Sequence, residues 1–247
     1  MLVRIENWAA WSPGVETRDD WQRWAAAPGP LQTEGQPEVK FLPSAVRRRS
    51  TRLTRMMLQA AFDCCGEALR SDVRTVFASR HGAIHVAVHI LESIVSGKPV
   101  SPMQFSHSVH NAQAGLYSIA AGNREASSSL AGEADTFGSA WIEAMLHLER
   151  APDTPVLLVI GDEPVPPKLL PLVDETPASY AVALLLRRAH ESADGVALTL
   201  EASEPPEIAS PLAWPQAIQF IAWLERADGL PLRLGAKRCY AFSPSAQ

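Results

Sequence analysis

The sequence VLLVIG at Val156–Gly161 and the run ASYAVALLL at Ala178–Leu186 decide the fold. Both stretches are short and almost continuously apolar, which is typical of strands that are buried on both faces of a sheet. Segments with helical periodicity lie on either side of them, so helices and buried strands alternate along the chain. This alternation predicts an α/β layered fold in which helices cover a mixed sheet.

Other segments extend the same alternation in both directions. Further strands are expected at Leu2–Trp11, Val73–Ser79, Ala126–Leu130, Val196–Glu201 and, as an edge strand, Lys237–Phe242. Helices are expected in a short segment capped by Thr17 and at Ser44–Leu69, Ala83–Val95, Asn111–Ala121, Asp135–Arg150 and Pro215–Arg226. The prolines cluster between these elements, so we expect ordered connections and a single domain over residues 1–247.

The composition narrows the classes of function. The chain has 247 residues and a formal net charge of −5, which weighs against a general nucleic-acid binder. Its three cysteines, Cys64, Cys65 and Cys239, match neither a disulfide framework nor a zinc-site spacing, and no cofactor is indicated. The N-terminal stretch MLVRIENWAAW lacks the pattern of a signal peptide, and the apolar runs are too short to cross a membrane. We therefore expect a reduced, cytoplasmic location.

Three histidines recur at a spacing of four residues. On one continuous helix, His81, His85 and His89 would share a face, as metal ligands can. Gly82 interrupts the segment, so His81 is expected in the loop before the helix, and neither an acidic residue nor a cysteine completes a ligand set. A structural or surface role is the favoured interpretation, and a metal site is the weaker alternative.

A cluster of arginines lies at the start of the first long helix. Its members are Arg47, Arg48, Arg49, Arg52 and Arg55. Such a cluster is most often a solvated helix face. The functional alternative is a docking surface for an acidic partner.

The turn Ala131-Gly132-Glu133-Ala134 joins an expected strand to an expected buried helix. A helix N-terminus stabilises negative charge and lowers the pKa of a thiol placed there. Glu133 or a direct neighbour occupies that position, and no cysteine is near it in the sequence. A carboxylate is favoured there electrostatically but cannot form a thioester. Glu133 is therefore either a helix-capping acid or a residue with a specialised role.

Three serines, Ser127–Ser129, precede the same turn. The G-x-S-x-G pattern of a nucleophile elbow is absent. A serine also needs a nearby base before it can attack a substrate, and the sequence nominates none. The end of a strand is the favoured interpretation of these residues.

Several blocks, in chain order, resemble the N-terminal half of the β-ketoacyl synthases of the thiolase-like superfamily. The blocks are Arg52–Ala61 (RLTRMMLQAA), Val76–Gly82 (VFASRHG), Ser101–Gly115 (SPMQFSHSVHNAQAG), Ser129–Ala144 (SLAGEADTFGSAWIEA), Val156–Pro164 (VLLVIGDEP) and Ala181–Leu186 (AVALLL). The third block is the most specific, because its core SVHNAQAG is similar to short ketosynthase-like proteins called chain length factors in aryl polyene and xanthomonadin-type pigment clusters. The similarity covers most of residues 1–200.

The resemblance implies a thiolase-like layered fold of the N-terminal-half type. A full ketosynthase places a cysteine at the turn that here contains Glu133, and it continues into a second half that carries two catalytic histidines. The present sequence resembles the first half and has no cysteine at the turn. The resemblance therefore implies a catalytically silent subunit that forms a heterodimer with a complete ketosynthase and meets an acyl carrier protein.

The same resemblance implies roles for individual residues. The candidates for the subunit interface or the acyl tunnel are Phe105, His110, Asn111, Ser129, Glu133, Phe137 and Trp141. The candidates for carrier docking are Arg47, Arg48, Arg49 and Arg52. The alternative function is that of an enzyme, a decarboxylase or acyl hydrolase that acts on acyl carrier thioesters through Glu133 or a serine.

Overall fold

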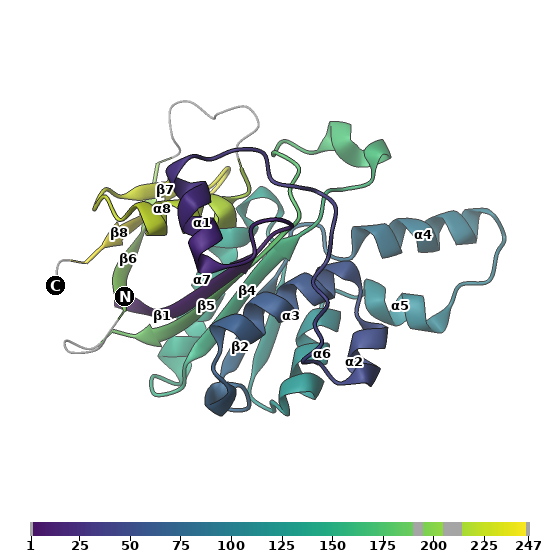
Figure 1. The fold of residues 1–247 in the computed structure, drawn as a ribbon, viewed down its shortest axis with the longest axis horizontal. Coiled ribbons are helices and arrows are strands. Elements are labelled where there is room, and N and C mark those ends of the chain that lie inside the picture. The colour runs from purple at the N-terminus through teal and green to yellow at the C-terminus, as the bar shows by residue number, and fades with distance from the viewer. Residues whose placement is uncertain (1, 190–194, 205–213, 246–247) are drawn as a thin grey trace.

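An eight-stranded mixed sheet forms the centre of the protein (Figure 1). The computed structural model describes residues 2–189, 195–204 and 214–245. The strands are β1 (Leu2–Trp11), β2 (Arg74–Ala78), β3 (Ser127–Leu130), β4 (Val156–Asp162), β5 (Tyr180–Arg188), β6 (Val196–Ser203), β7 (Leu232–Leu234) and β8 (Cys239–Pro244). They lie in the order β3-β2-β4-β5-β1-β6-β8-β7; β2 is parallel to β3 and β4, and the other pairs are antiparallel. The predicted α/β mixed sheet is confirmed.

Helices cover both faces of this sheet. The helices of the described residues are α1 (Arg18–Ala26), α2 (Ser44–Arg49), α3 (Arg52–Cys64), α4 (Ile84–Val95), α5 (Pro102–Ser108), α6 (Ala112–Ala121), α7 (Thr136–Arg150) and α8 (Gln216–Arg226), with 3-10 turns η1 (Glu67–Leu69), η2 (Glu133–Asp135) and η3 (Pro167–Leu172). The side chains of α3 and α6 join the core on one face, and those of α1, α7 and α8 join the core on the other.

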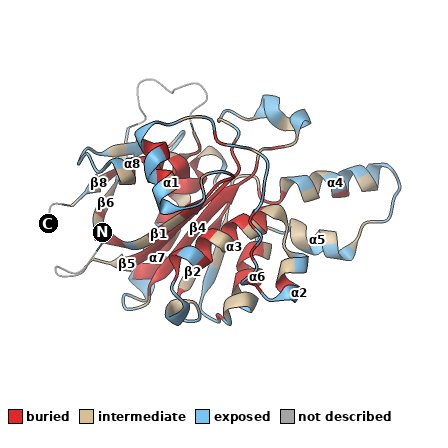
Figure 2. Ribbon diagram, viewed as in Figure 1, coloured by how far each residue is buried: buried red, intermediate tan, exposed pale blue. Residues whose placement is uncertain are grey.

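The strand β4 contributes side chains to the hydrophobic cores on both faces of the sheet. Val156, Leu158 and Ile160 point into the core beneath α7 and α8, whereas Leu157 and Val159 point into the core beneath α3. Every residue of β4 is buried, and Figure 2 shows the centre of the sheet in red. Because neighbouring strand residues face opposite sides, burial on both faces explains why VLLVIG has no polar alternation.

Local capping sets several of the helix ends. The Thr17 side chain accepts the Asp20 N–H, and the Asp20 side chain accepts the Thr17 N–H in return, so a capping box starts α1 as predicted. Gly122 adopts φ 64° and ends α6, a left-handed position that suits glycine.

The predicted helix Ser44–Leu69 is wrong as one element. Ser50 is extended, and the Thr51 hydroxyl accepts the Thr54 N–H at 3.1 Å, so the chain ends α2 and starts α3 at this point. Serine and threonine offer the backbone this alternative to a continuous helix. Cys65 is extended as well and ends α3 before η1 begins.

Three elements were not expected from the sequence, namely α5, η3 and β7. The strand β8 is also not the edge strand that Lys237–Phe242 was predicted to form, because β7 pairs with its outer side. These elements are short, and periodicity over three to seven residues is too weak to identify them.

The helices α4 and α5 form a hairpin that projects from the body of the protein (Figure 1). We call residues 84–108 the α4–α5 hairpin. Its outer apolar side chains are exposed, with Leu91 at 60%, Val95 at 87% and Phe105 at 60%. No helix in the described ranges is both long and apolar enough to span a bilayer.

Gly161 in β4 tests how tightly the sheet packs against α3. A Cβ atom at this position would lie 2.8 Å from the Tyr180 carbonyl oxygen and 3.0 Å from Met57 Cγ. Gly161→Ala should therefore lower the free energy of unfolding by about 1–3 kcal/mol, measured by urea denaturation. Gly115→Ala in α6 is the control, because open space surrounds its Cβ position and alanine favours a helix by about 0.5–1 kcal/mol. Equal effects of the two substitutions would contradict this packing.

Candidate functional site

The turn between β3 and α7 is a tight elbow. Glu133 has φ +53°, a left-handed conformation that non-glycine residues rarely adopt. The Thr136 hydroxyl donates to the Glu133 carbonyl at 2.7 Å and accepts the Gly132 N–H at 3.0 Å. A strained turn from a strand into a helix is the geometry that presents a nucleophile in other enzyme folds, and the residue presented here is Glu133.

Asp135 fixes the elbow from within. Its buried carboxylate accepts backbone N–H groups from Ala236, Lys237 at 3.0 Å and Arg238 at 2.9 Å. These three donors lie in the turn between β7 and β8, about one hundred positions along the chain. Hydrogen bonds to a carboxylate are among the stronger ones, so this contact ties the start of α7 to the C-terminal strands.

The Glu133 side chain lies at the surface. It pairs with Lys237 at 2.6 Å, and both side chains are 77% exposed. The ammonium of Lys237 lowers the pKa of the Glu133 carboxyl, which keeps it ionised. Among the described residues, no hydrogen bond or ion pair joins Glu133 to a histidine. The elbow therefore offers an exposed carboxylate without an adjacent imidazole.

A second polar feature lies at the carboxyl ends of β2 and β4. The buried Asp162 carboxylate accepts the Ser79 hydroxyl at 2.7 Å and the N–H groups of Arg80 at 2.8 Å and His81 at 2.9 Å. Burial raises the pKa of Asp162, and these donors oppose the rise. The Tyr180 hydroxyl also hydrogen-bonds with Asp162, and burial raises the pKa of this phenol. Asp162 thus organises the loop that follows β2.

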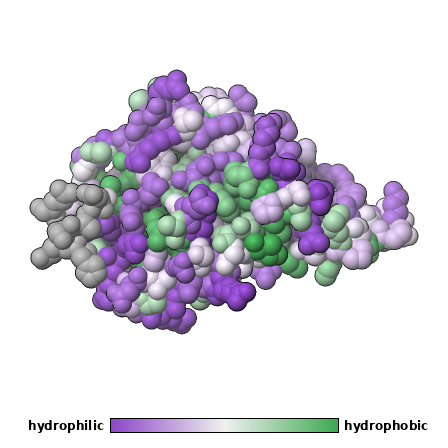
Figure 3. All heavy atoms as spheres, turned by 60° about the horizontal axis from the view of Figure 1, so that its bottom comes forward, coloured by the Kyte–Doolittle hydropathy of each residue, from purple (hydrophilic) through white to green (hydrophobic). Residues whose placement is uncertain are grey.

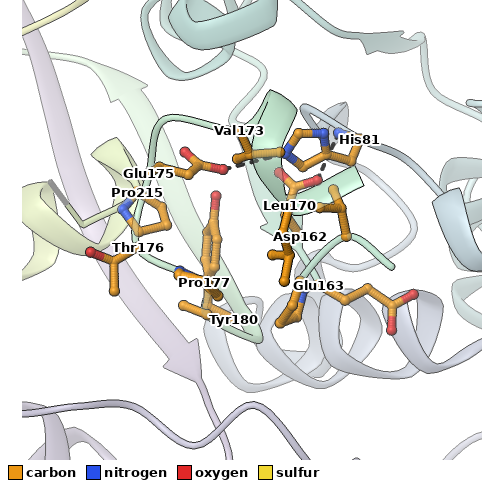
Figure 4. A pocket seen from close by; sticks show the side chains of 13 residues that line it. His81, Asp162, Glu163, Leu170, Val173, Glu175, Thr176, Pro177, Tyr180 and Pro215 are labelled. Atoms are coloured by element: carbon orange, nitrogen blue, oxygen red, sulfur yellow. Dashed lines mark hydrogen bonds and ion pairs between the residues drawn. The ribbon is translucent and has the colours of Figure 1, made fainter. Parts of the chain in front are cut away.

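A small cleft of about 20 Å³ lies beside Asp162 (Figure 4). In Figure 4, His81 and Glu175 face each other at 3.4 Å, and the Tyr180 hydroxyl lies between Glu175 and Asp162. Glu163 points away from these groups. Every ionised side chain that faces the cleft has a partner within the protein, so the cleft is a satisfied polar network with apolar walls.

Buried Glu163 forms a separate pair with half-buried Arg52. Arg52 Nη1 lies 3.4 Å from Glu163, and the guanidinium also donates to the Ser179 hydroxyl at 2.8 Å and the Gly35 carbonyl at 2.7 Å. Burial raises the pKa of Glu163, and the guanidinium opposes that rise. Arg52 is therefore turned inward, apart from the other arginines of its cluster, Arg47, Arg48, Arg49 and Arg55.

The three spaced histidines have different partners. His81 lies in the loop before α4, as predicted, and contacts Glu175. His85 Nε2 lies 2.8 Å from the Pro164 carbonyl, and His89 is exposed on α4. Within the described ranges, no group of three histidine, cysteine, aspartate or glutamate side chains is placed to hold a metal ion.

Ser128 has a histidine neighbour that the sequence did not reveal. The Ser128 hydroxyl donates to Glu143 at 2.6 Å and lies 2.9 Å from His147 Nε2, which is itself 3.3 Å from Glu143. Glu143 and His147 are four residues apart on α7, so they share a face.

This cluster does not have the arrangement of a hydrolytic triad. In a triad, the carboxylate binds Nδ1 while Nε2 receives the serine proton. Here Glu143 lies beside Nε2, and the buried Nδ1 of His147 has no hydrogen-bond partner. The Ser128 hydroxyl donates its hydrogen bond to Glu143. For Nε2 to bond to either oxygen it must therefore carry a hydrogen, and it is then unavailable as a base. The cluster holds β3 against α7.

The structure divides the other site candidates into two groups. Phe105 is exposed on α5, while His110 and Asn111 lie between α5 and α6, with His110 Nε2 2.7 Å from the Leu130 carbonyl at the end of β3. Ser129 lies on β3 next to them. In contrast, Phe137 and Trp141 are buried and pack against Phe220 and Phe242 on the far side of α7.

Replacing Glu133 tests the strained elbow. Glu133→Gly should raise the urea midpoint of unfolding, because glycine adopts φ +53° without the Cβ clash, whereas Glu133→Ala should give no such gain. Asp135→Ala should lower the free energy of unfolding by about 1–3 kcal/mol, because three backbone N–H donors lose the charged acceptor that they share. A loss of stability in Glu133→Gly would show that the elbow is not strained.

His147 should make stability depend on pH. Burial lowers the pKa of His147 below its usual 6.5 in the folded state, so the unfolded chain binds more protons at and below about pH 6.5. The stabilisation from neutral His147 is therefore complete above pH 6.5 and is lost as the pH falls. Chemical denaturation at pH 7.5 and 5.5 should show a larger loss in the wild type than in His147→Gln, which does not titrate. Parallel pH profiles would refute the assignment.

The chain was compared with known families, sequences and structures. Residues 21–237 match the family described as β-ketoacyl synthase, N-terminal domain. No curated protein sequence matches the chain.

Solved structures with the same fold include ketosynthase complexes. A chain of the structure "Ketosynthase (ApeO) in Complex with its Chain Length Factor (ApeC) from Xenorhabdus doucetiae" has a TM-score of 0.80 and 24% identity, over 98% of this chain and 99% of that one. The ishigamide ketosynthase/chain length factor has a TM-score of 0.65 and 16% identity, over 82% of this chain and 68% of that one. A β-ketoacyl synthase from Burkholderia phymatum has a TM-score of 0.58 and 16% identity, over 76% of this chain and 59% of that one. The family match extends over most of the chain, and so the chain belongs to the family of β-ketoacyl synthase N-terminal domains.

Proposed function

We propose that the chain is a chain length factor, a ketosynthase-like subunit that does not itself condense acyl groups. It pairs with an active β-ketoacyl synthase in the synthesis of a polyene of the polyketide or fatty-acid type. The observation that carries this proposal is Glu133, which occupies the left-handed position of the elbow and points a carboxylate, not a thiol, to the surface. A carboxylate paired with Lys237 cannot form the thioester on which condensation depends.

The comparisons support a role in a ketosynthase complex. The fold match covers 98% of this chain and 99% of a chain in the ApeO–ApeC complex. A second match is the ishigamide ketosynthase/chain length factor.

The exposed surface also supports a partner. Apolar side chains gather on the α4–α5 hairpin and beside it, at Leu91, Ile94, Val95, Met103, Phe105 and Val109. Figure 3 shows hydrophobic atoms toward the side of the protein that carries this hairpin. A contiguous exposed apolar surface in a soluble protein commonly marks an interface.

The strand β3 lies next to this surface and is an edge strand of the sheet. Its outer N–H and C=O groups are available to a strand from another chain. Ser129 lies on this edge, and His110 binds the Leu130 carbonyl at its end. In the proposed complex, β3, His110, Asn111 and Phe105 contact the synthase, while Phe137 and Trp141 support α7 from behind.

The enzyme alternative gains no support from the geometry. Glu133 is exposed to water and kept ionised by Lys237, so it lacks the dry pocket that would raise its pKa into the range of a general acid. The Ser128 hydroxyl donates its hydrogen bond to Glu143, and His147 is not placed to act as its base. Neither residue is arranged to attack or protonate a thioester.

Co-expression with a full-length β-ketoacyl synthase from the same organism should give a stable 1:1 complex, detected by size-exclusion chromatography with light scattering. Phe105→Glu should weaken the complex at least about tenfold, because it places a charge in a desolvated apolar contact. Leu230→Glu is the matched control, since Leu230 is equally apolar and 65% exposed but lies at the opposite end, between α8 and β7. A chain that remains monomeric beside the ketosynthase, or equal weakening by both variants, would disprove the interface.

Activity assays separate the proposal from the enzyme alternative. The isolated chain should neither condense, decarboxylate nor hydrolyse an acyl carrier thioester, and Glu133→Ala should leave the activity of the complex intact. Turnover by the isolated chain that is abolished in Glu133→Ala or Ser128→Ala would establish the enzyme function instead.

A further inference from the structure

The α4–α5 hairpin projects from the protein without sharing in its hydrophobic cores. Among the described residues, neither core includes a side chain from residues 84–108. Ile90 is the one buried residue of α4, and α5 has none, although both helices are described in full. An element with so few buried apolar contacts has low local stability. Its orientation therefore depends on contacts of another kind.

A second projecting segment lies beside α4, on the connection from β4 to β5 (Figure 1). We call residues 164–175 the strap; it contains η3. Among the strap residues, all of which the structure describes, Val165 alone is buried. Apolar packing thus contributes little to the placement of the strap, and polar contacts dominate it.

The loop between β2 and α4 clamps the end of the strap. The Arg80 guanidinium lies 2.8 Å from the Asp174 carboxylate and 3.2 Å from that of Glu175, and its side chain is only 17% exposed. His81 Nε2 lies 3.4 Å from the same Glu175 (Figure 4). The hydrogen bond from Arg80 lowers the pKa of Asp174, which keeps this carboxylate ionised. Hydrogen bonds between a guanidinium and carboxylates are among the stronger ones, so this clamp fixes the strap to the body of the protein.

One face of α4 contacts the strap at two points. His85 Nε2 lies 2.8 Å from the Pro164 carbonyl at the start of the strap, and the Glu92 carboxylate lies 2.9 Å from Lys168 Nζ in η3. His85 and Glu92 are about two helical turns apart, so they lie on the same face of α4. His89 lies between them on this face. The regular spacing of the histidines therefore follows the side of α4 that lies toward the strap.

We infer that the strap is a brace for the α4–α5 hairpin. It connects α4 to the Arg80 clamp, and so it holds the apolar surface of the hairpin in one orientation for a protein partner. The other end of the hairpin is fixed only at its base, where His110 Nε2 lies 2.7 Å from the Leu130 carbonyl. A binding element that is already ordered loses less conformational freedom when its partner binds. The identity of that partner, a β-ketoacyl synthase, rests on the proposed function.

The contacts between α4 and the strap are individually weak, which makes the brace easy to release. The side chains of Lys168 and Glu92 are 79% and 54% exposed, and such exposed pairs commonly change an equilibrium constant by about fivefold or less. Because the hairpin has little other support, an effect of this size should be visible in its local opening.

Hydrogen–deuterium exchange of the full chain tests the brace. Lys168→Glu places two carboxylates beside each other and should raise the exchange rate of the α4 amides about three- to tenfold. The amides of β4 and β5 should not change. The charge-swapped variant Lys168→Glu/Glu92→Lys should restore the exchange of the wild type. Lys98→Glu is the matched control, because it makes the same change of charge at an exposed position in the turn between α4 and α5.

Binding to a full-length β-ketoacyl synthase from the same organism then connects the brace to the partner. Lys168→Glu should raise the Kd of the complex about three- to tenfold, and the charge swap should restore it. Unchanged α4 exchange in Lys168→Glu, an equal increase in Lys98→Glu, or no rescue by the charge swap would overturn the brace. Faster exchange with an unchanged Kd would overturn its role in partner binding. If exchange changes as expected but the wild type does not bind the synthase, the proposed function fails and the brace is retained.

Discussion

The structure depends on the burial of β4 and β5 on both faces. These two strands send alternate side chains into two separate cores, and the helices on each side can pack only because the sheet between them has no polar face. The strands β2 and β3 run parallel to β4, so the carboxyl ends of all three strands lie along one edge of the sheet. Ser79, Glu133 and Asp162 therefore reach the same edge from three distant parts of the sequence. In α/β folds, ligands and active groups commonly lie at such an edge.

Periodicity and turn chemistry were sufficient to predict the sheet, most helices and the elbow. The apolar runs of β4 and β5, the Thr17 cap and the Gly122 stop are local signals, and each has the expected local consequence. The break at Ser50 was missed because two competing hydrogen-bonding patterns are available to the same residues. The sequence placed Glu133 or a direct neighbour at the elbow, but only the structure revealed that Glu133 itself has the left-handed backbone and that its side chain is exposed.

The polar networks were harder to predict from the sequence. Asp162 follows a strong strand, which was a usable signal, yet its partners Ser79 and Tyr180 come from other strands and loops. His147 was overlooked as a neighbour of Ser128 because nineteen positions separate them. Phe137 and Trp141 are large enough to limit a tunnel, but bulk alone does not reveal that they face Phe220 and Phe242. Long-range contacts of this kind are set by the packing of elements and not by any local pattern.

The contact between Asp135 and residues 236–238 has a consequence for how the protein is made. The chain is synthesised from its N-terminus, so β3 and α7 leave the ribosome before residues 236–238. The backbone N–H groups of these later residues donate to the Asp135 carboxylate. Until then, a newly synthesised chain carries an uncompensated acid at the bend. The final shape of the bend is therefore one of the last features to form during translation, and a tag or cleavage near the C-terminal strands would act on it from far away in sequence.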